Sequence, residues 1–373
     1  MSAARRPDAD ARARAIAPVF AVEGTLIGLE THEGGHINES WVARFAIARG
    51  EKRFLLQHIN RFVFHEPARL MENMVRVTRH VAAHLRRDDT PDPGRRVLAV
   101  VPTRAGSTHH TEPDGEVWRL MPFIEGTRSG EVAGTAGEAG AAARALGLFL
   151  RQLADLPEPP LHETIPRFHD TPWRFTALEE AVARDPQRRV GSARREVDAL
   201  FARRPLAEAL VALADDDPSL VRTVHNDAKV SNVLFDVATN EPLCVVDLDT
   251  VMPGLALCDF GDLVRSTVSD SAEDERDLGR VRVRLPVFAG LARGFVSGAG
   301  DVLRPVERAH LVTAAKVIVL EQAARFLSDH LDGDRYYRIR RPGHNLDRAR
   351  TQLRLLESLE EHEPELRRAV DAL

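Results

Sequence analysis

The chain opens with strand-like segments and continues with helix-like ones, and this change constrains the fold most strongly. Residues 19–57 alternate apolar and polar side chains with a period near two, which indicates β-strands around the turn THEGGHINES. Residues 65–87 carry apolar side chains at helical spacing and indicate one helix. Residues 95–103 and 115–124 are expected to form two further strands. Together these segments predict a small α+β lobe.

The second part of the chain has a different character. Residues 133–156 are rich in Ala and Leu and predict a long helix. Its glycines follow no strand and lack the spacing of a dinucleotide fingerprint, so we expect them at a helix-packing surface. Further helices are expected over 172–183, over 193–214 with a break at its proline, and towards the C-terminus. We therefore place a lobe boundary between residues 1–122 and 123–373.

The composition excludes several classes of protein. The 373 residues carry 43% apolar and 29% charged side chains, which suits a soluble enzyme with two cores. The net charge of −5 argues against a nucleic-acid partner. Cys244 and Cys258 have no CxxC or zinc spacing, which fits a reducing compartment. We see no signal peptide and no apolar run long enough for a bilayer, so we expect a cytoplasmic protein without a membrane partner; its oligomeric state is left open.

Two neighbouring stretches, TVHNDAKVSNVLFD and CVVDLDTVMPG, concentrate the polar chemistry of the chain. Asp227 and Asn232 lie five residues apart, and Asp247 ends the second of two short apolar strands that follow. Phosphoryl transfer needs a base for the acceptor hydroxyl and oxygen ligands for Mg²⁺, and this spacing is typical of kinase-type sites that supply them. We expect Asp227 to be the base and Asn232 and Asp247 to bind metal. His225 is expected to hold the loop shape and Lys229 to reach the transferring group.

Three other interpretations of these stretches stay open or are disfavoured. The first stretch alone is also compatible with a surface turn, because its residue types favour loops. Asp249 is either a second metal ligand or a structural residue. The string CDFGD contains Asp259, which looks like the metal ligand of a DFG motif, but it follows Asp227 by too many residues to return across one short hairpin. We expect Asp259 to begin a helix and brace the loop instead.

At this point the residues resemble a known family. The strings VHNDAKVSNVLFD, VVDLDTVMPG and CDFGDLVRS are similar to those of aminoglycoside phosphotransferase-like kinases. Within them, the longer strings, among them GGHINESWV, FLLQHIN, IPRFHDT and EQAARFLSDHLDGDRYY, most resemble N-acetylhexosamine 1-kinases. The resemblance implies a two-lobed protein-kinase-like fold, with a nucleotide-binding lobe and a catalytic and acceptor-binding lobe. It also implies ATP, Mg²⁺, and phosphorylation of the anomeric hydroxyl of a sugar such as GlcNAc or GalNAc.

The same resemblance assigns the nucleotide site. The loop EGGHINES, with Gly34, Gly35 and Asn38, takes the place of a glycine-rich phosphate loop. Gln57 stands where protein kinases have a lysine, which opens the interpretation of a non-catalytic nucleotide-binding protein. Glu72 is expected either to partner Gln57 or to lie on a solvated helix face. The interlobe segment is expected to present backbone groups to adenine; its residues are Met121, Phe123 and Ile124.

The acceptor is the least constrained part of the prediction. Sugar binding needs an aromatic platform and convergent polar groups, and two helical-lobe strings offer them. The candidates are Phe168, His169, Asp170, Arg174, Arg325 and Tyr336. Packed aromatics and solvated charges are the alternative for each of them. An aminoglycoside or another small alcohol is the competing acceptor class, although the mixture of arginine and aspartate argues against a polycation.

Overall fold

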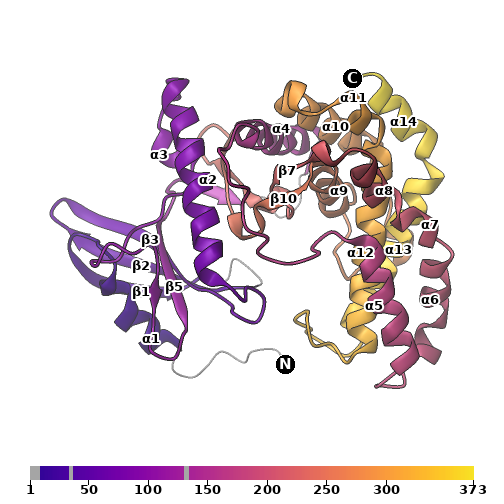
Figure 1. Ribbon diagram of the computed structural model, residues 1–373, viewed down its shortest axis with the longest axis horizontal. Coiled ribbons are helices and arrows are strands. Elements are labelled where there is room, and N and C mark those ends of the chain that lie inside the picture. The colour runs from indigo at the N-terminus through magenta and orange to yellow at the C-terminus, as the bar shows by residue number, and fades with distance from the viewer. Residues whose placement is uncertain (1–8, 33–36, 130–133) are drawn as a thin grey trace.

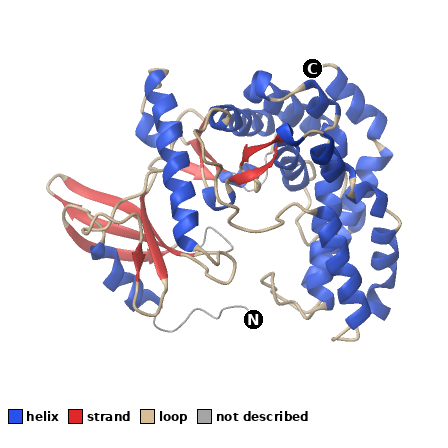
Figure 2. Ribbon diagram, viewed as in Figure 1, coloured by secondary structure: helices blue, strands red, loops and turns tan. Residues whose placement is uncertain are grey.

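The computed structural model describes residues 9–32, 37–129 and 134–373, and these form two lobes (Figure 1). The smaller lobe is built on a five-stranded antiparallel sheet in the order β1-β2-β3-β5-β4. Its strands are β1 (Thr25–Thr31), β2 (Glu39–Ile47), β3 (Gly50–His58), β4 (His110–Thr111) and β5 (Val117–Pro122). Helices form most of the larger lobe (Figure 2). The predicted α+β architecture of a small sheet lobe and a larger helical lobe is confirmed.

The two faces of this sheet bury alternate side chains against different helices. Trp41 and Phe45 of β2 pack in one cluster with α1 (Ala9–Ile16), a helix that the sequence analysis did not assign. Met121 of β5 packs in a second cluster with α2 (Pro67–Arg87), the helix predicted over 65–87. Alternate residues of a strand face opposite sides of a sheet, so both helices are needed to cover it.

The expected strand over residues 95–103 is wrong. A short helix, α3 (Pro93–Arg96), occupies its start, and the following residues form only isolated bridges, one of them between Val101 and Leu120. The Val101 N–H donates to Leu120 O at 2.9 Å, but Pro102 has no N–H with which to extend a ladder. The apolar pattern of this segment therefore indicates that its side chains pack in the lobe, and not that its backbone pairs in a sheet.

The larger lobe contains eleven helices in its described residues, and none in the described parts of the chain is long and apolar enough to span a bilayer. They are α4 (Ala136–Leu153), α5 (Thr171–Arg184), α6 (Arg194–Phe201), α7 (Arg204–Ala207), α8 (Ala209–Asp216), α9 (Ala256–Thr267), α10 (Leu285–Ala299), α11 (Pro305–Ala309), α12 (Leu311–Leu331), α13 (His344–Glu361) and α14 (Glu363–Asp371). The break expected at Pro205 is confirmed, because α6 ends before it and α7 begins beside it.

Glycines allow α4 and α10 to pack with their backbones in contact. A Cβ atom on Gly294 of α10 would lie 2.1 Å from the carbonyl oxygen of Gly140 on α4. A Cβ atom on Gly298 would lie 2.2 Å from the carbonyl oxygen of Arg144. The expected packing role is thus confirmed for Gly140, whereas Gly137 has only ordinary contacts near the start of the helix.

Two short sheets in the larger lobe position the motif residues. One sheet has the order β6-β8-β9 and the other pairs β10 with β7, all antiparallel. Their bounds are β6 (Thr127–Ser129), β7 (Val221–Val224), β8 (Val233–Asp236), β9 (Pro242–Val245) and β10 (Met252–Leu255). The loop between β7 and β8 carries the first motif, and the chain leaving β9 carries the second. The predicted hairpin of two short strands is therefore present as β8 and β9.

Candidate active site

The loop of residues 225–232, called the HND loop below, is fixed by bonds from a helix. Both carboxylate oxygens of Asp259, in the first turn of α9, accept backbone N–H groups, from His225 at 3.0 Å and from Asn226 at 2.7 Å. Asn226 has a φ of 63°, a left-handed conformation that asparagine tolerates. Asp259 is buried, and its carboxylate holds the HND loop, as expected for a residue that braces the loop.

A second set of bonds ties the HND loop to the chain that leaves β9. His225 is fully buried, and its Nε2 lies 3.0 Å from Val246 O. The Val246 N–H donates to Asn232 O at 2.9 Å. Thr250 Oγ1 donates to His225 O at 2.8 Å. The hairpin therefore returns so that Asp247 follows directly after a residue bonded to both ends of the HND loop.

Asp227 lies at the centre of this arrangement. Its carboxylate is 2.9 Å from Lys229 Nζ, and the Asn232 Nδ2 donates to its backbone oxygen at 2.8 Å. Burial favours the neutral acid, but the neighbouring Lys229 ammonium outweighs it and lowers the pKa of Asp227 to about 2. The carboxylate is therefore ionised at neutral pH. Asn232 uses its amide nitrogen here, and no hydrogen bond from the described residues occupies its amide oxygen.

Asp247 has the opposite electrostatic environment. Desolvation by the surrounding protein and the carboxylates of Asp249 and Asp227 raise its pKa to about 6. Solvent reaches the Asp247 side chain, so repulsion from the two carboxylates is the main physical cause of the raised pKa. A divalent cation relieves the repulsion that raises the pKa of a carboxylate beside other carboxylates, so the donor set of Asp247 and Asn232 fits Mg²⁺.

Asp249 is held differently although it lies only two residues further on. Its oxygens accept from Arg119 Nη2 at 2.9 Å and from Asn38 Nδ2 at 2.7 Å. The Asp249 and Arg119 side chains are almost fully buried, so this is an internal ion pair. Of the two alternatives for Asp249, the structure favours the structural one.

Arg119 of β5 is the residue that the sequence analysis missed. Its guanidinium donates to Gln57 Oε1 through Nε at 2.9 Å and through Nη2 at 2.7 Å. Gln57 and Arg119 are cross-strand partners, so the positive charge sits one strand away from the place that a kinase lysine would take. The detectable signal was a single arginine within the apolar run VWRLMPF.

The expected pairing of Glu72 with Gln57 is not formed. Glu72 has a half-exposed side chain and lies 2.9 Å from His162 Nε2, whereas Gln57 donates to Ser40 Oγ at 3.0 Å. The pairing fails because a carboxylate can only accept, and the Gln57 amide nitrogen already donates to Ser40. Glu72 thus follows the alternative of a helix-surface residue, which here ties α2 to the larger lobe.

The other residues predicted for the nucleotide site have different outcomes in the structure. Gly34 and Gly35 lie outside the described residues, while Asn38 contacts Asp249 and accepts from the Asn60 N–H at 3.0 Å. The Phe123 N–H donates to Arg53 O at 3.1 Å, so the adenine contact expected through that amide is not available. Met121 and Ile124 are buried beside it.

The acceptor candidates divide into two groups. His169 is bonded to Glu321 at 2.9 Å and to Asn226 O at 2.7 Å, and Asp170 caps α5 by accepting from the Trp173 N–H. Because polar atoms of both residues already have partners within the protein, we leave His169 and Asp170 out of the acceptor proposal. The remaining candidates are a group that we call the acceptor cluster: Phe168, Arg174, Arg325 and Tyr336.

Charge and unpaired polar atoms mark the acceptor cluster. The Arg325 guanidinium lies 5.2 Å from the ring centroid of Phe168. Burial and the charge of Arg325 lower the pKa of Arg174, whose Nε is buried without a partner among the described residues. Asp262 of α9, which the sequence analysis did not single out, pairs with Arg265 and leaves Oδ2 buried and unbonded within the described chain. Its spacing from Asp259, about one helical turn, was the available signal.

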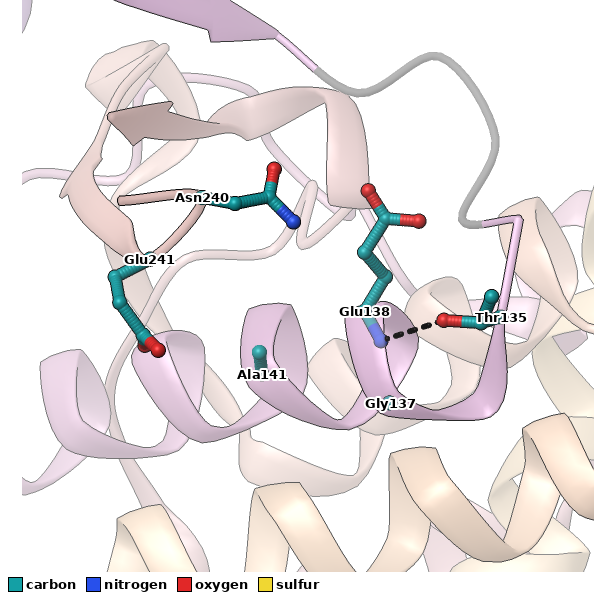
Figure 3. Close-up of a pocket in the computed structure, with 6 residues that line it drawn as sticks. All are labelled: Thr135, Gly137, Glu138, Ala141, Asn240 and Glu241. Carbon is teal, nitrogen blue, oxygen red and sulfur yellow. Dashed lines mark hydrogen bonds between the residues drawn. The ribbon is translucent and has the colours of Figure 1, made fainter. Parts of the chain in front are cut away.

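The cavity drawn in Figure 3 lies elsewhere. It has a volume of about 380 Å³ and is lined by the start of α4 and the β8–β9 turn. Thr135 caps α4 there by accepting from the Glu138 N–H at 3.2 Å. None of the candidate catalytic, nucleotide-site or acceptor residues lines this cavity, so we do not place the chemistry in it.

Comparison with known proteins identifies the family. A family model described as "Phosphotransferase enzyme family" matches residues 29–293. A spectinomycin phosphotransferase solved with ADP and spectinomycin aligns with a TM-score of 0.60 at 13% identity, covering 95% of this chain and 100% of that one. An aminoglycoside phosphotransferase from Alicyclobacillus acidocaldarius aligns at 0.54 and 16%, covering 94% of each chain. A choline/ethanolamine kinase family protein from Mesorhizobium loti aligns at 0.51 and 18%, covering 97% of this chain and 99% of that one.

The structural matches have low identity and bear on the fold alone, and they confirm the predicted two-lobed kinase-like fold. The family model adds the sequence relationship, because it spans both lobes and contains the HND loop and Asp247. The chain therefore belongs to the phosphotransferase enzyme family.

Proposed function

We propose that this phosphotransferase transfers the γ-phosphoryl group of ATP, with Mg²⁺, to the anomeric hydroxyl of an N-acetylhexosamine. The bond from Pγ to the β,γ-bridging oxygen breaks, a bond from Pγ to the sugar C1 oxygen forms, and the hydroxyl proton passes to Asp227. The products are the sugar 1-phosphate and ADP. The observation that carries the proposal is an ionised Asp227, paired with Lys229 and set beside Asp247 and Asn232.

Asp227 is suited to orient the acceptor hydroxyl rather than to act as a strong base. A carboxylate with a pKa of about 2 accepts a hydrogen bond at neutral pH and takes the proton only as the new bond forms. The loose transition state of phosphoryl transfer needs little more than this. Lys229 adds a positive charge 2.9 Å from the same carboxylate, where negative charge moves during transfer.

We assign the metal to Asp247 and to the amide oxygen of Asn232. When bound, Mg²⁺ neutralises phosphate charge and so makes the leaving group of the reaction less costly to form. Asp249 supports this site from outside, because its pairing with Arg119 fixes the short segment that carries Asp247. His225 holds the same segment from the other side through Val246 O.

The nucleotide is assigned to the small-lobe side of this cluster. Gly34, Gly35 and Asn38 are proposed to approach the phosphates, and Met121 and Ile124 to line the adenine. Gln57 and Arg119 together are proposed to replace the usual lysine, because Gln57 orients a guanidinium that carries the charge it lacks itself. This pairing favours a functional nucleotide site over a pseudokinase.

The acceptor is assigned to the acceptor cluster with Asp262. Once the side chains that bury these atoms move, a sugar can donate a hydroxyl to the unbonded Asp262 Oδ2 and accept from the unbonded Arg174 Nε. Phe168 and Tyr336 offer aromatic faces for the sugar ring. Arg325 interacts electrostatically with Arg174 and with Arg265, and this positive charge disfavours a polycationic aminoglycoside.

A phosphorus NMR screen tests the proposal, because it reports both the acceptor and the phosphorylated position. The wild type is incubated with ATP, Mg²⁺ and GlcNAc, GalNAc, glucose, choline or kanamycin, and Asp227→Asn serves as the inactive control. We expect an anomeric phosphate resonance with GlcNAc or GalNAc and none with kanamycin. Phosphorylated kanamycin or choline would assign the competing small-alcohol function. Bound ATP without turnover on any acceptor would assign the pseudokinase function.

A further inference from the structure

A group of metal-ligating side chains lies where α2 meets the chain that follows α4. His80 and His84 are one helical turn apart on α2, and Asp155 follows the end of α4. The Nε2 atoms of His80 and His84 each lie 2.9 Å from the same oxygen, Asp155 Oδ1. One ligand atom from each of the three residues falls within 4.8 Å of the others. None of these residues belongs to the proposed active site.

We propose that His80, His84 and Asp155 bind one Zn²⁺-class transition-metal ion. Two imidazole nitrogens and one carboxylate oxygen are a donor set that Zn²⁺ and its neighbours prefer, whereas Mg²⁺ prefers oxygen donors alone. Both histidine side chains are largely buried, with 15% and 11% exposed, while Asp155 is 61% exposed. Water can therefore complete the coordination from the Asp155 side.

Neighbouring bonds hold the three ligands in place before any ion binds. Along the same face of α2, Arg76 Nη2 donates to Pro157 O at 2.6 Å and Asn73 Nδ2 donates to His162 O at 2.7 Å. The face of α2 is thus fastened to residues 155–162 at three successive points. A preorganised ligand set binds with a smaller entropic cost, and an ion here would link the small lobe to the large one.

A plain hydrogen-bonded tie is the competing explanation. In that case both imidazoles donate their Nε2 protons to Asp155, and no ion is involved. The two explanations differ at Arg87, whose Nη2 lies 2.7 Å from His84 Nδ1. A metal on Nε2 requires the proton of His84 on Nδ1, facing a guanidinium that only donates. The exposed Arg87 side chain must then turn away, so removing it favours the ion.

The test measures Zn²⁺ binding to the tag-free full chain by equilibrium dialysis. Excess Mg²⁺ is present, so that it occupies sites made of oxygen ligands alone. The matched variants are His80→Gln and His84→Gln, because glutamine keeps a donor towards Asp155 but is a poor zinc ligand. His65→Ala removes an exposed histidine before α2 as a control. Asp247→Ala tests whether the active site is the source of binding.

We expect one Zn²⁺ per chain in the wild type, in His65→Ala and in Asp247→Ala. Each glutamine variant is expected to lose at least about tenfold in affinity, and Arg87→Ala to gain a few fold. Zinc should raise the melting temperature of the wild type but not of the glutamine variants, which should keep the wild-type circular dichroism spectrum. Binding that is unchanged in both glutamine variants, or weaker than about 100 μM in the wild type, would establish a hydrogen-bonded tie only.

Discussion

The HND loop and the acceptor cluster differ in how the chain builds them. The HND loop and Asp247 lie within one short stretch. The side chains of Asp259 and Thr250 and the backbone of Val246 hydrogen-bond to the backbone of this loop at both of its ends. The acceptor cluster is assembled from α5, α12 and the segments around them, and it retains an unbonded buried nitrogen on Arg174. Phosphoryl chemistry is thus placed on a rigid local frame, while recognition of the acceptor depends on distant elements.

This difference separates two kinds of substitution. Changes in the rigid frame should remove turnover on every acceptor, because they act on groups that touch the transferring phosphoryl or its metal. Changes in the acceptor cluster should alter which acceptor is used and at what concentration, with little effect on the nucleotide. The predictions below test that separation, from the largest expected effect to the smallest.

Asp227→Asn is expected to have the largest effect, a loss of about 10³-fold or more in kcat on all acceptors. The amide keeps the shape of the side chain but cannot take the hydroxyl proton. Coupled ADP release measures the rate, with the exposed Asp215→Asn as a charge-matched control. Retention of activity within tenfold of the wild type would remove Asp227 from the chemistry.

Arg119→Met tests whether the frame depends on its buried ion pair. The substitution leaves Asp249 buried and unpaired, which should cost about 3–5 kcal/mol of unfolding free energy. Urea denaturation measures the loss, and the double variant Arg119→Met with Asp249→Leu should recover much of it because no charge remains buried. If the single variant unfolds at the wild-type urea concentration, the pair is not part of the frame.

Arg325→Ala tests the other side of the comparison. It removes a guanidinium from the acceptor cluster but touches no proposed nucleotide residue. We expect the acceptor KM to rise by about tenfold or more while the KM for ATP stays within twofold. Steady-state kinetics with each substrate varied in turn gives both values. An equal rise in both constants would show that the two sites are not separable.

The sequence predicted the rigid frame better than the rest of the site, for a physical reason. The spacing of Asp227, Asn232 and Asp247 is set by a loop and one hairpin. Short-range geometry of this kind can be predicted from the sequence. Arg119 was missed because its role depends on which strand lies beside β3. For Glu72 the sequence left two alternatives open, and the choice between them depends on tertiary contacts in the same way.

Two further outcomes show how tertiary contacts override local pattern. Residues 95–103 have the composition of a strand. They form no continuous ladder of hydrogen bonds, because Pro102 lacks a backbone N–H. His169 and Asp170 looked like acceptor ligands by type, but Glu321 and the start of α5 engage their polar atoms. Which partner a polar side chain finds cannot be inferred from its type alone.

Asp247→Asn is expected to have the smallest effect on stability, with a size that depends on pH. The pKa of about 6 in the folded protein lies above the unfolded value near 4, so without metal the wild type loses stability as pH rises through this window. The variant lacks this loss. Without Mg²⁺ it should melt on the order of 2 °C above the wild type at pH 8 and at nearly the same temperature at pH 4. A lower melting temperature at pH 8 would contradict the carboxylate repulsion.

The most direct test of the central claim is Mn²⁺ binding in the presence of an ATP analogue, followed by electron paramagnetic resonance. The account predicts that the wild type binds the ion and that Asn232→Ala and Asp247→Ala each lose it. Asp259→Asn should keep binding it, because Asp259 holds the loop and not the metal. Full Mn²⁺ binding by Asp247→Ala, together with its loss in a folded Asp259→Asn, would contradict the account.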